Sequence, residues 1–315
     1  MTFLYWLESI RTGFGDLLMA TVTRFGEEAI FIVLALLFLW CIDKKEGYYL
    51  LTVGFFGLLC NQFLKILCRV PRPWVKDPSF TVVEGTKEAA SGYSFPSGHT
   101  QTAVGSYGAI ARYEKKTWIR VLGIALCVLV PFSRMYLGVH TPLDVGVSLF
   151  IALALIFALH PLFKTLDEHP YRLFYVLGAL LLLSIGFVLY VELGNFEGVD
   201  AHNYASAVKN AYTLLGSLCG FLLIYFLDVR FFHYETKAPL LAQLLKLLVG
   251  VGAVLLVKSL LKAPISALCG GHAVSNAVRY FLMFAVAGGV CPILFPYFTK
   301  FANYWKEKMG KKSKE

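Results

Sequence analysis

The sequence predicts an all-α fold, a polytopic bundle of transmembrane helices. Of the 315 residues, 57% are hydrophobic and only 16% are charged, whereas about a quarter of the residues in a soluble domain carry a charge. The hydrophobic residues also gather in runs of roughly 20 residues, the length that a helix needs to cross a bilayer. Composition and run length together favour a membrane protein over a soluble one.

The apolar runs predict about nine spans, separated by short polar segments. In chain order, the expected spans are 27–42, 47–68, 99–113, 118–137, 143–163, 173–193, 210–228, 239–262 and 276–299. The third span is the weakest, because Thr100, Gln101, Thr102 and Ser106 interrupt its apolar run. We include it because of the polar residues that flank it.

The two ends of the chain are expected to lie outside the bilayer core. Residues 1–24 mix aromatic side chains with Glu8, Arg11 and Asp16, a pattern typical of an amphipathic helix at the membrane surface. An ordinary packed terminal helix would give the same pattern. Residues 301–315 form a basic tail, which we expect to face the anionic lipids of the cytoplasmic leaflet.

The net charge of +9 does not indicate nucleic-acid binding, because the cations lie in short loops and in the tail. If the first span enters from the outer side, more than half of the 29 lysine and arginine residues fall on the inner side. The positive-inside rule therefore favours a cytoplasmic C-terminus. The same topology places the loops 69–98 and 134–142 together on the outer face.

Those two loops and the adjoining span ends hold residues suited to binding phosphate. Lys65, Arg72 and Arg134 supply cations, and arginine in particular presents a planar fork that matches phosphate oxygens. Ser97 and Gly98 lie where a loop meets a helix N-terminus, whose free N–H groups favour anions. The sequence therefore predicts a phosphate site built from these five residues.

Two histidines are expected to carry the chemistry. If a helix begins with Thr141 as its N-cap, Asp144 falls at its third position and can reach back towards the imidazole of His140. A carboxylate on one ring nitrogen leaves the other nitrogen free to act as a nucleophile. His99, in the other loop, is placed to protonate the leaving oxygen.

Simpler explanations exist for each residue taken alone. A single histidine in a membrane helix is usually structural, and a lysine at a helix end usually snorkels to the interface. Charges in spans cost about 2.5–3.5 kcal/mol each, however, so a group of them on one face indicates function. No carboxylate cluster suits a metal ion, and the seven cysteines form no CxxC pair. We therefore expect free thiols, no metal and no cofactor.

Three motifs in this region resemble the signatures of the type 2 phosphatidic acid phosphatase (PAP2) superfamily. They are Lys65-x6-Arg72-Pro73, Pro96-Ser97-Gly98-His99 and Ser133-Arg134-x5-His140-x3-Asp144. The resemblance implies a catalytic membrane core over residues 25–170, followed by additional transmembrane helices over residues 171–300. It also implies a phosphohistidine at His140 that water hydrolyses, with Asp144 as its partner and His99 as acid and then base.

The expected function is hydrolysis of a phosphomonoester or diphosphate without a metal ion. The expected partners are membrane lipids and a phosphorylated lipid substrate of the phosphatidate, phosphatidylglycerophosphate or prenyl diphosphate type. A sugar-phosphate phosphatase of the glucose-6-phosphatase type and a lipid phosphotransferase stay open as alternatives. A transporter or scramblase is the alternative without catalysis, and vanadium haloperoxidases share the anion cage but are soluble.

The second half of the chain carries no motif that we can interpret. Its polar residues either recognise a substrate headgroup or pair with one another for structure, and we favour pairing. They are Glu197, Asp200, His202, Lys209, Lys258 and Arg279. We expect a multi-pass protein of the plasma or cell membrane with its active site on the non-cytoplasmic side; the sequence does not indicate the substrate or the oligomeric state.

Overall fold

A computed structural model describes residues 1–88 and 90–312 of the chain, and within these ranges every regular element is helical. Among the described residues, seven helices are long and apolar enough to cross a membrane, or up to eight with the bent pair Gly13–Gly26 and Glu28–Ile42. The predicted all-α transmembrane bundle is therefore confirmed, and the predicted count of about nine spans is approximate. The expected spans 27–42 and 99–113 are helical but shorter than the others.

The chain divides into two compact units, each assembled from separate stretches of sequence. The first unit consists of Met1–Ile32, Tyr49–Thr165 and Gly186–Ala211. The second unit consists of Val33–Tyr48, Leu166–Ile185 and Tyr212–Glu315. Four helices contribute residues to both units: α3 (Glu28–Leu37), α4 (Lys44–Cys68), α10 (Tyr171–Leu193) and α11 (Ala201–Leu227). The expected domain limits at 25–170 and 171–300 stay a prediction.

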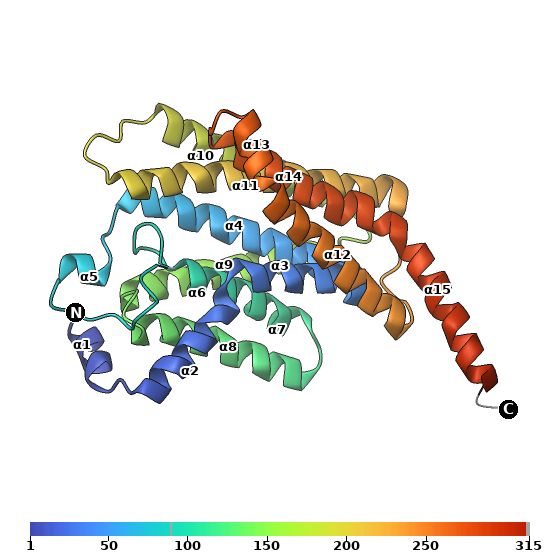
Figure 1. Cartoon of the computed structure of the whole chain (residues 1–315), viewed down its shortest axis with the longest axis horizontal. Helices are drawn as coiled ribbons and strands as arrows, with labels where there is room; N and C mark the ends of the chain where they lie inside the picture. Colours follow the sequence, from blue (N-terminus) through green and yellow to red (C-terminus); the bar gives the residue numbers. More distant parts are fainter. Residues whose placement is uncertain (89, 313–315) are drawn as a thin grey trace. The chain divides into compact units, whose positions relative to one another are not determined.

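The first unit contains most of the short helices (Figure 1). Besides its parts of the shared helices, it holds α1 (Thr2–Ser9), α2 (Gly13–Thr23), η1 (Arg24–Gly26), α5 (Pro73–Lys76), α6 (Gly98–Ala103), η3 (Val104–Gly108), α7 (Ala109–Tyr113), α8 (Thr117–Tyr136) and α9 (Pro142–Lys164). The π-helical turn η3 joins α6 to α7, and this segment packs against α8 and α9. The approach to α8 is close because Gly123 lacks a side chain: a Cβ there would lie 2.8 Å from the Tyr107 carbonyl oxygen.

The second unit holds the C-terminal helices. They are η2 (Phe38–Ile42), η4 (Asp228–Phe232), α12 (Leu240–Leu260), α13 (Lys262–Leu268), α14 (Val274–Ala285), η5 (Val286–Val290) and α15 (Cys291–Lys312). Asp228 accepts hydrogen bonds from Lys44 at 2.7 Å and from the Tyr48 hydroxyl at 2.9 Å. Helix α15 continues through residues 301–312 of the expected basic tail, and residues 313–315 lie outside the described residues.

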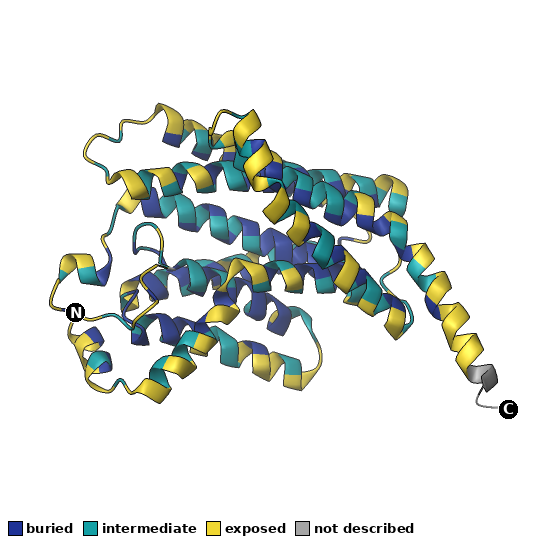
Figure 2. Cartoon of the chain, viewed as in Figure 1, coloured by how far each residue is buried: buried dark blue, intermediate teal, exposed yellow. Residues whose placement is uncertain are grey.

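Exposed residues occur along the helices of both units (Figure 2), and many of them are large and apolar. In the first unit Trp118 is 66% exposed and Phe150 73%, and in the second unit Leu240 is 76% exposed. A water-soluble surface rarely carries apolar patches of this extent. These faces are suited to the hydrocarbon of a bilayer, which accounts for the low proportion of charged residues.

The N-terminal segment forms two short helices with different surroundings. Leu4 and Leu7 of α1 are fully buried, so α1 packs as an ordinary terminal helix would. In contrast, Phe14 and Leu17 of α2 are 77% and 69% exposed, which leaves this face available to lipid. The interfacial position expected for residues 1–24 stays a prediction.

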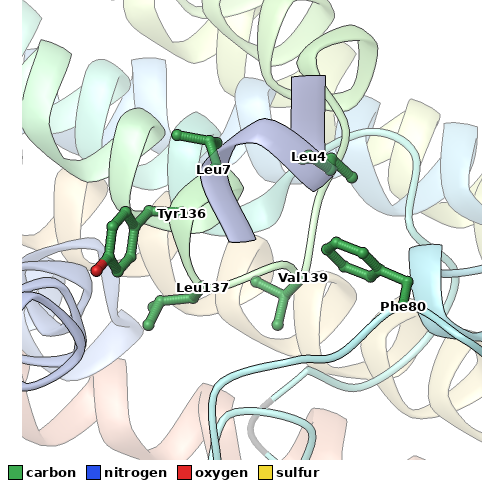
Figure 3. Close-up of a cluster of buried hydrophobic side chains, with 6 residues drawn as sticks. All are labelled: Leu4, Leu7, Phe80, Tyr136, Leu137 and Val139. Atoms are coloured by element: carbon green, nitrogen blue, oxygen red, sulfur yellow. The ribbon is translucent and has the colours of Figure 1, made fainter. Parts of the chain in front are cut away.

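A buried apolar cluster ties α1 to the loop between α8 and α9 (Figure 3). Its members are Leu4, Leu7, Phe80, Tyr136, Leu137 and Val139. Arg11 strengthens this connection by donating from Nε to the Tyr136 carbonyl oxygen at 2.9 Å. The cluster therefore fixes the backbone immediately before His140.

Candidate active site

The start of α9 positions His140 and Asp144. Pro142 occupies the first helical position, and Thr141 forms a capping box with Asp144. Within this box the Thr141 backbone N–H donates to Asp144 Oδ2 at 2.8 Å. The predicted cap is confirmed, and it holds the carboxylate on the side of the helix end where His140 lies.

The imidazole and the carboxylate face each other across a short gap. His140 Nδ1 lies 3.6 Å from Asp144 Oδ2, which is beyond a good hydrogen bond. Both side chains are almost completely buried, at 2% and 1% exposed. A small movement would bring the pair into hydrogen-bond contact and fix the proton on Nδ1, leaving Nε2 with its lone pair.

Arg72 lies against the other ring nitrogen of His140. Its Nη1 is 3.0 Å from His140 Nε2 and also donates to the Val139 carbonyl oxygen at 3.0 Å. The other guanidinium nitrogens donate to the carbonyl oxygens of Gly92 and Ser91. Arg72 is therefore held by backbone acceptors and not by a carboxylate.

Lys65 and Arg134 are also held by uncharged hydrogen-bond acceptors. Lys65 Nζ donates to the Tyr93 carbonyl oxygen at 2.5 Å, and Arg134 Nη1 donates to Thr23 Oγ1 at 2.8 Å. Arg134 Nε has no hydrogen-bond partner within the described part of the chain. Both side chains are buried yet retain donors that a ligand could use.

The charges of the site do not balance. Among residues 1–88 and 90–312, none of Lys65, Arg72 and Arg134 forms an ion pair with a carboxylate. These three cations and His99 act electrostatically on His140, and Asp144 is the carboxylate that lies 3.6 Å from its ring. Burial, followed by the nearby cations, holds the pKa of His140 well below its ordinary value of 6.5. A buried excess of positive charge is costly unless an anion compensates it.

Ser97 and Gly98 form the start of α6. The Ser97 hydroxyl is the N-cap and accepts from the Thr100 backbone N–H at 3.4 Å. The Ser97 backbone N–H donates to the Asp144 carbonyl oxygen at 3.0 Å, which links α6 to α9. A Cβ at Gly98 would meet only Asn61 Oδ1, at 3.8 Å, so the protein itself leaves space in front of this residue.

Comparison with known protein families matches the region that carries the three motifs. Residues 45–168 match the PAP2 superfamily, and residues 212–302 match the transmembrane extension of PAP2 superfamily phosphatases. Undecaprenyl-diphosphatase BcrC of Bacillus subtilis is 30% identical over 141 residues, which are 44% of this chain and 69% of that protein. The chain belongs to the PAP2 superfamily.

Other PAP2 relatives differ in how much of the chain they match. An undecaprenyl-diphosphatase of Sulfolobus acidocaldarius is 32% identical over 131 residues, 41% of this chain and 61% of that protein. A probable sphingosine-1-phosphate phosphatase of Dictyostelium discoideum is 27% identical over 263 residues, 77% of this chain and 60% of that protein. This chain thus spans about three fifths of the length of these two proteins. No solved structure is significantly similar to it.

One residue of this PAP2 site was missed by the sequence analysis. Ser94 is completely buried, and its hydroxyl donates to Asp144 Oδ2 at 2.6 Å. It lies only three positions before Ser97, so the polar segment that precedes the second motif was the available signal. Asp144 Oδ2 therefore accepts two hydrogen bonds, from Ser94 and from Thr141.

Two of the polar residues named in the second half, Asp200 and Arg279, have local hydrogen-bond partners. Asp200 accepts from the Asn203 backbone N–H at 2.9 Å at the start of α11. Arg279 Nη2 donates to Asn276 Oδ1 at 3.0 Å within α14. Among the described residues, no group of three or more histidine, cysteine, aspartate or glutamate side chains could hold a metal ion.

Proposed function

We propose that this PAP2 protein is a membrane phosphatase that hydrolyses a phosphomonoester or diphosphate of a lipid. The observation that carries the proposal is the buried excess of positive charge beside an imidazole. Among the described residues, Lys65, Arg72 and Arg134 form no ion pair with a carboxylate, and Asp144 faces His140. A phosphate group supplies the missing negative charge and offers oxygens to the remaining donors.

The proposed reaction has two steps. Burial and the three cations lower the pKa of His99 to about 3, and the negative charge of a bound phosphate opposes this effect and lets the ring carry a proton. In the first step, His140 Nε2 attacks phosphorus, the bond to the leaving oxygen breaks, and His99 gives that oxygen its proton. In the second, His99 takes a proton from water, the hydroxide attacks phosphorus, and the phosphorus–nitrogen bond breaks to release phosphate. Catalysis of this kind depends on positioning and on neutralising the equatorial oxygens. The three cations supply that neutralisation, and Ser97 and Gly98 add backbone N–H groups.

The names of the relatives support a lipid substrate. Two are undecaprenyl-diphosphatases and one is a probable sphingosine-1-phosphate phosphatase, all acting by name on phosphorylated lipids. Apolar side chains cover the helices, so the substrate is expected to reach the site from the bilayer. By the positive-inside argument the site lies on the non-cytoplasmic side.

A phosphate-release assay on the purified full-length protein tests this function. The panel contains phosphatidate, phosphatidylglycerophosphate, a prenyl diphosphate, sphingosine-1-phosphate and glucose-6-phosphate, with EDTA present and His140→Ala as the blank. We expect release from at least one lipid and none from the blank. Release from glucose-6-phosphate alone would favour the sugar-phosphate alternative, and transfer of labelled phosphate to a lipid alcohol would favour a phosphotransferase.

A further inference from the structure

A small polar pocket lies next to the phosphate site within the first unit. It is bounded by α4, by the first turns of α11 and by the loop segment 91–93, and its cavity volume is about 40 Å³. A buried water needs about 10–15 Å³ by this kind of measure, so the pocket holds roughly three waters. That is room for a small polar group and not for a second lipid chain.

Neutral hydrogen-bonding groups line most of this pocket. Helix α11 contributes Asn203, Ser206 and Asn210, whose spacing puts them on one face of the helix. Gln62 of α4 faces them, and the Asn210 amide donates to its side-chain oxygen at 2.9 Å. This bond leaves an amide donor on Gln62 and an amide acceptor on Asn210, which together suit a hydroxyl group.

The pocket and the phosphate site share a wall. Ser91 lines the pocket, and its carbonyl oxygen accepts from Arg72 Nη2 at 2.8 Å. The same guanidinium contacts His140 through Nη1 at 3.0 Å. Lys65 also lines the pocket while its ammonium donates to the Tyr93 carbonyl oxygen. The pocket is therefore linked to His140 through the Ser91 backbone and the Arg72 guanidinium.

The charges of the residues that line the pocket restrict the class of ligand further. Among the described residues that line the pocket there is no carboxylate to balance the charge of an ammonium group, and the cation among them, Lys65, also belongs to the phosphate site. Asn203, Ser206 and Asn210 are neutral, so a second phosphate would find no additional positive charge among the described α11 residues that line the pocket. A hydroxyl group is the ligand that matches both the size and the neutral donors and acceptors.

We propose that this pocket, formed by α4, α11 and segment 91–93, binds a hydroxyl group adjacent to the phosphate ester in the substrate. The inference rests on the proposed phosphatase function and makes it more specific. The favoured substrate class is the phosphomonoester of a hydroxylated lipid backbone. An isoprenoid diphosphate, whose chain has no hydroxyl, is disfavoured.

Two matched substrates test the pocket. One is an acyl glycerol phosphate with a free hydroxyl on the central carbon, and the other is the same compound without that hydroxyl. We expect the full-length protein in detergent micelles to prefer the hydroxylated compound in kcat/KM by roughly fivefold for each hydrogen bond formed. Ser206→Leu, which fills the pocket, should bring the ratio of the two kcat/KM values close to one.

A control variant and a second pocket variant distinguish a loss of substrate specificity from a loss of folding. Ala205→Leu adds the same bulk at the neighbouring position of α11, which is exposed and does not line the pocket, and should keep the wild-type ratio. Asn203→Ala is a smaller change that should lower the ratio if Ser206→Leu proves unstable. An equal rate on both substrates in the wild type, or an unchanged ratio in both pocket variants, would overturn the pocket while leaving the phosphatase function intact. Hydrolysis of neither substrate, nor of any lipid in the wider panel, would overturn the function and the pocket with it.

Discussion

Asp144 receives hydrogen bonds from two groups that are distant in the sequence, the Ser94 hydroxyl and the Thr141 backbone N–H. The bond from Thr141 follows from local chemistry, because a threonine cap and an aspartate three residues later form a capping box in many helices. The bond from Ser94 depends on how the loop before α6 folds back on α9. Sequence spacing therefore predicted one of the two contacts, and only the fold revealed the other.

Removing the Ser94 hydroxyl tests its role as a positioning residue. We expect Ser94→Ala to lower kcat by about 10–100-fold with little change in KM, because a hydrogen bond to a charged group contributes roughly 1.5–3 kcal/mol. Ser94→Thr should restore part of the loss. Ser106→Ala serves as the control, since its hydroxyl is also buried but bonds only to the Thr102 carbonyl oxygen. Equal kcat losses in the two alanine variants would indicate a general packing effect.

The pH dependence reports on His140. Attack requires the neutral imidazole, and burial together with the neighbouring cations lowers its pKa below 6.5. The acid limb of kcat/KM should therefore lie below that pH, with activity retained as pH falls through 6.5. Lys65→Gln should move the limb to higher pH while lowering the rate, since it removes a cation that favours the neutral ring.

The substrate phosphate also ionises near pH 6, but this ionisation is the same for the wild type and for Lys65→Gln. The difference between the two profiles thus isolates the imidazole. An acid limb that does not move between wild type and Lys65→Gln would contradict the assignment of this limb to His140.

At the scale of structural elements, the loop between α8 and α9 is the part that the sequence described least well. The third motif predicted which residues the loop carries. The conformation of the loop depends on α1 and Phe80, which pack against it (Figure 3). Gly138 adopts a φ of +82°, and a Cβ there would lie 2.9 Å from the Phe80 ring and 2.7 Å from Arg11. Long-range packing of this kind leaves no periodic signal in the sequence.

We expect Gly138→Ala to lower both stability and activity. The left-handed conformation alone costs a side chain about 1–2 kcal/mol, and relief of the two close contacts would move the backbone that leads to His140. Thermal unfolding and kcat, measured in the same detergent, check both effects. Gly146→Ala on α9 is the matched control, because a Cβ there meets nothing within 4 Å. Gly146→Ala should leave kcat unchanged. A similar loss of kcat in both variants would contradict the role of the Gly138 loop in positioning His140.

At the scale of the whole molecule, composition was enough to predict the fold class. Long apolar runs need helices to satisfy their backbone groups in lipid, and the helices occur where the runs do. The number of spans was less certain, because the segment Gly98–Tyr113 contains polar residues that serve the site and not the bilayer. The pocket on α11 could not be predicted, since its asparagines and serine match no motif.

The membrane orientation is a prediction that labelling can check. Loop charges favour a cytoplasmic C-terminus, which places the loop after α13 (Lys262–Leu268) on the outer side with Cys269. In a variant whose only cysteine is Cys269, a membrane-impermeant maleimide should react with intact cells. A cysteine introduced at Lys308 should react only after permeabilisation. The reverse pattern would invert the topology and place the active site on the cytoplasmic face.

The central claim is that His140 carries the phosphoryl group during turnover. The most direct measurement is to quench the purified protein in alkali during hydrolysis of a labelled lipid phosphate and to locate the label by peptide mass spectrometry. We expect an acid-labile, alkali-stable phosphohistidine at His140, absent from His140→Ala, which should also lack turnover. A label on a different residue, or full turnover by His140→Ala, would contradict it.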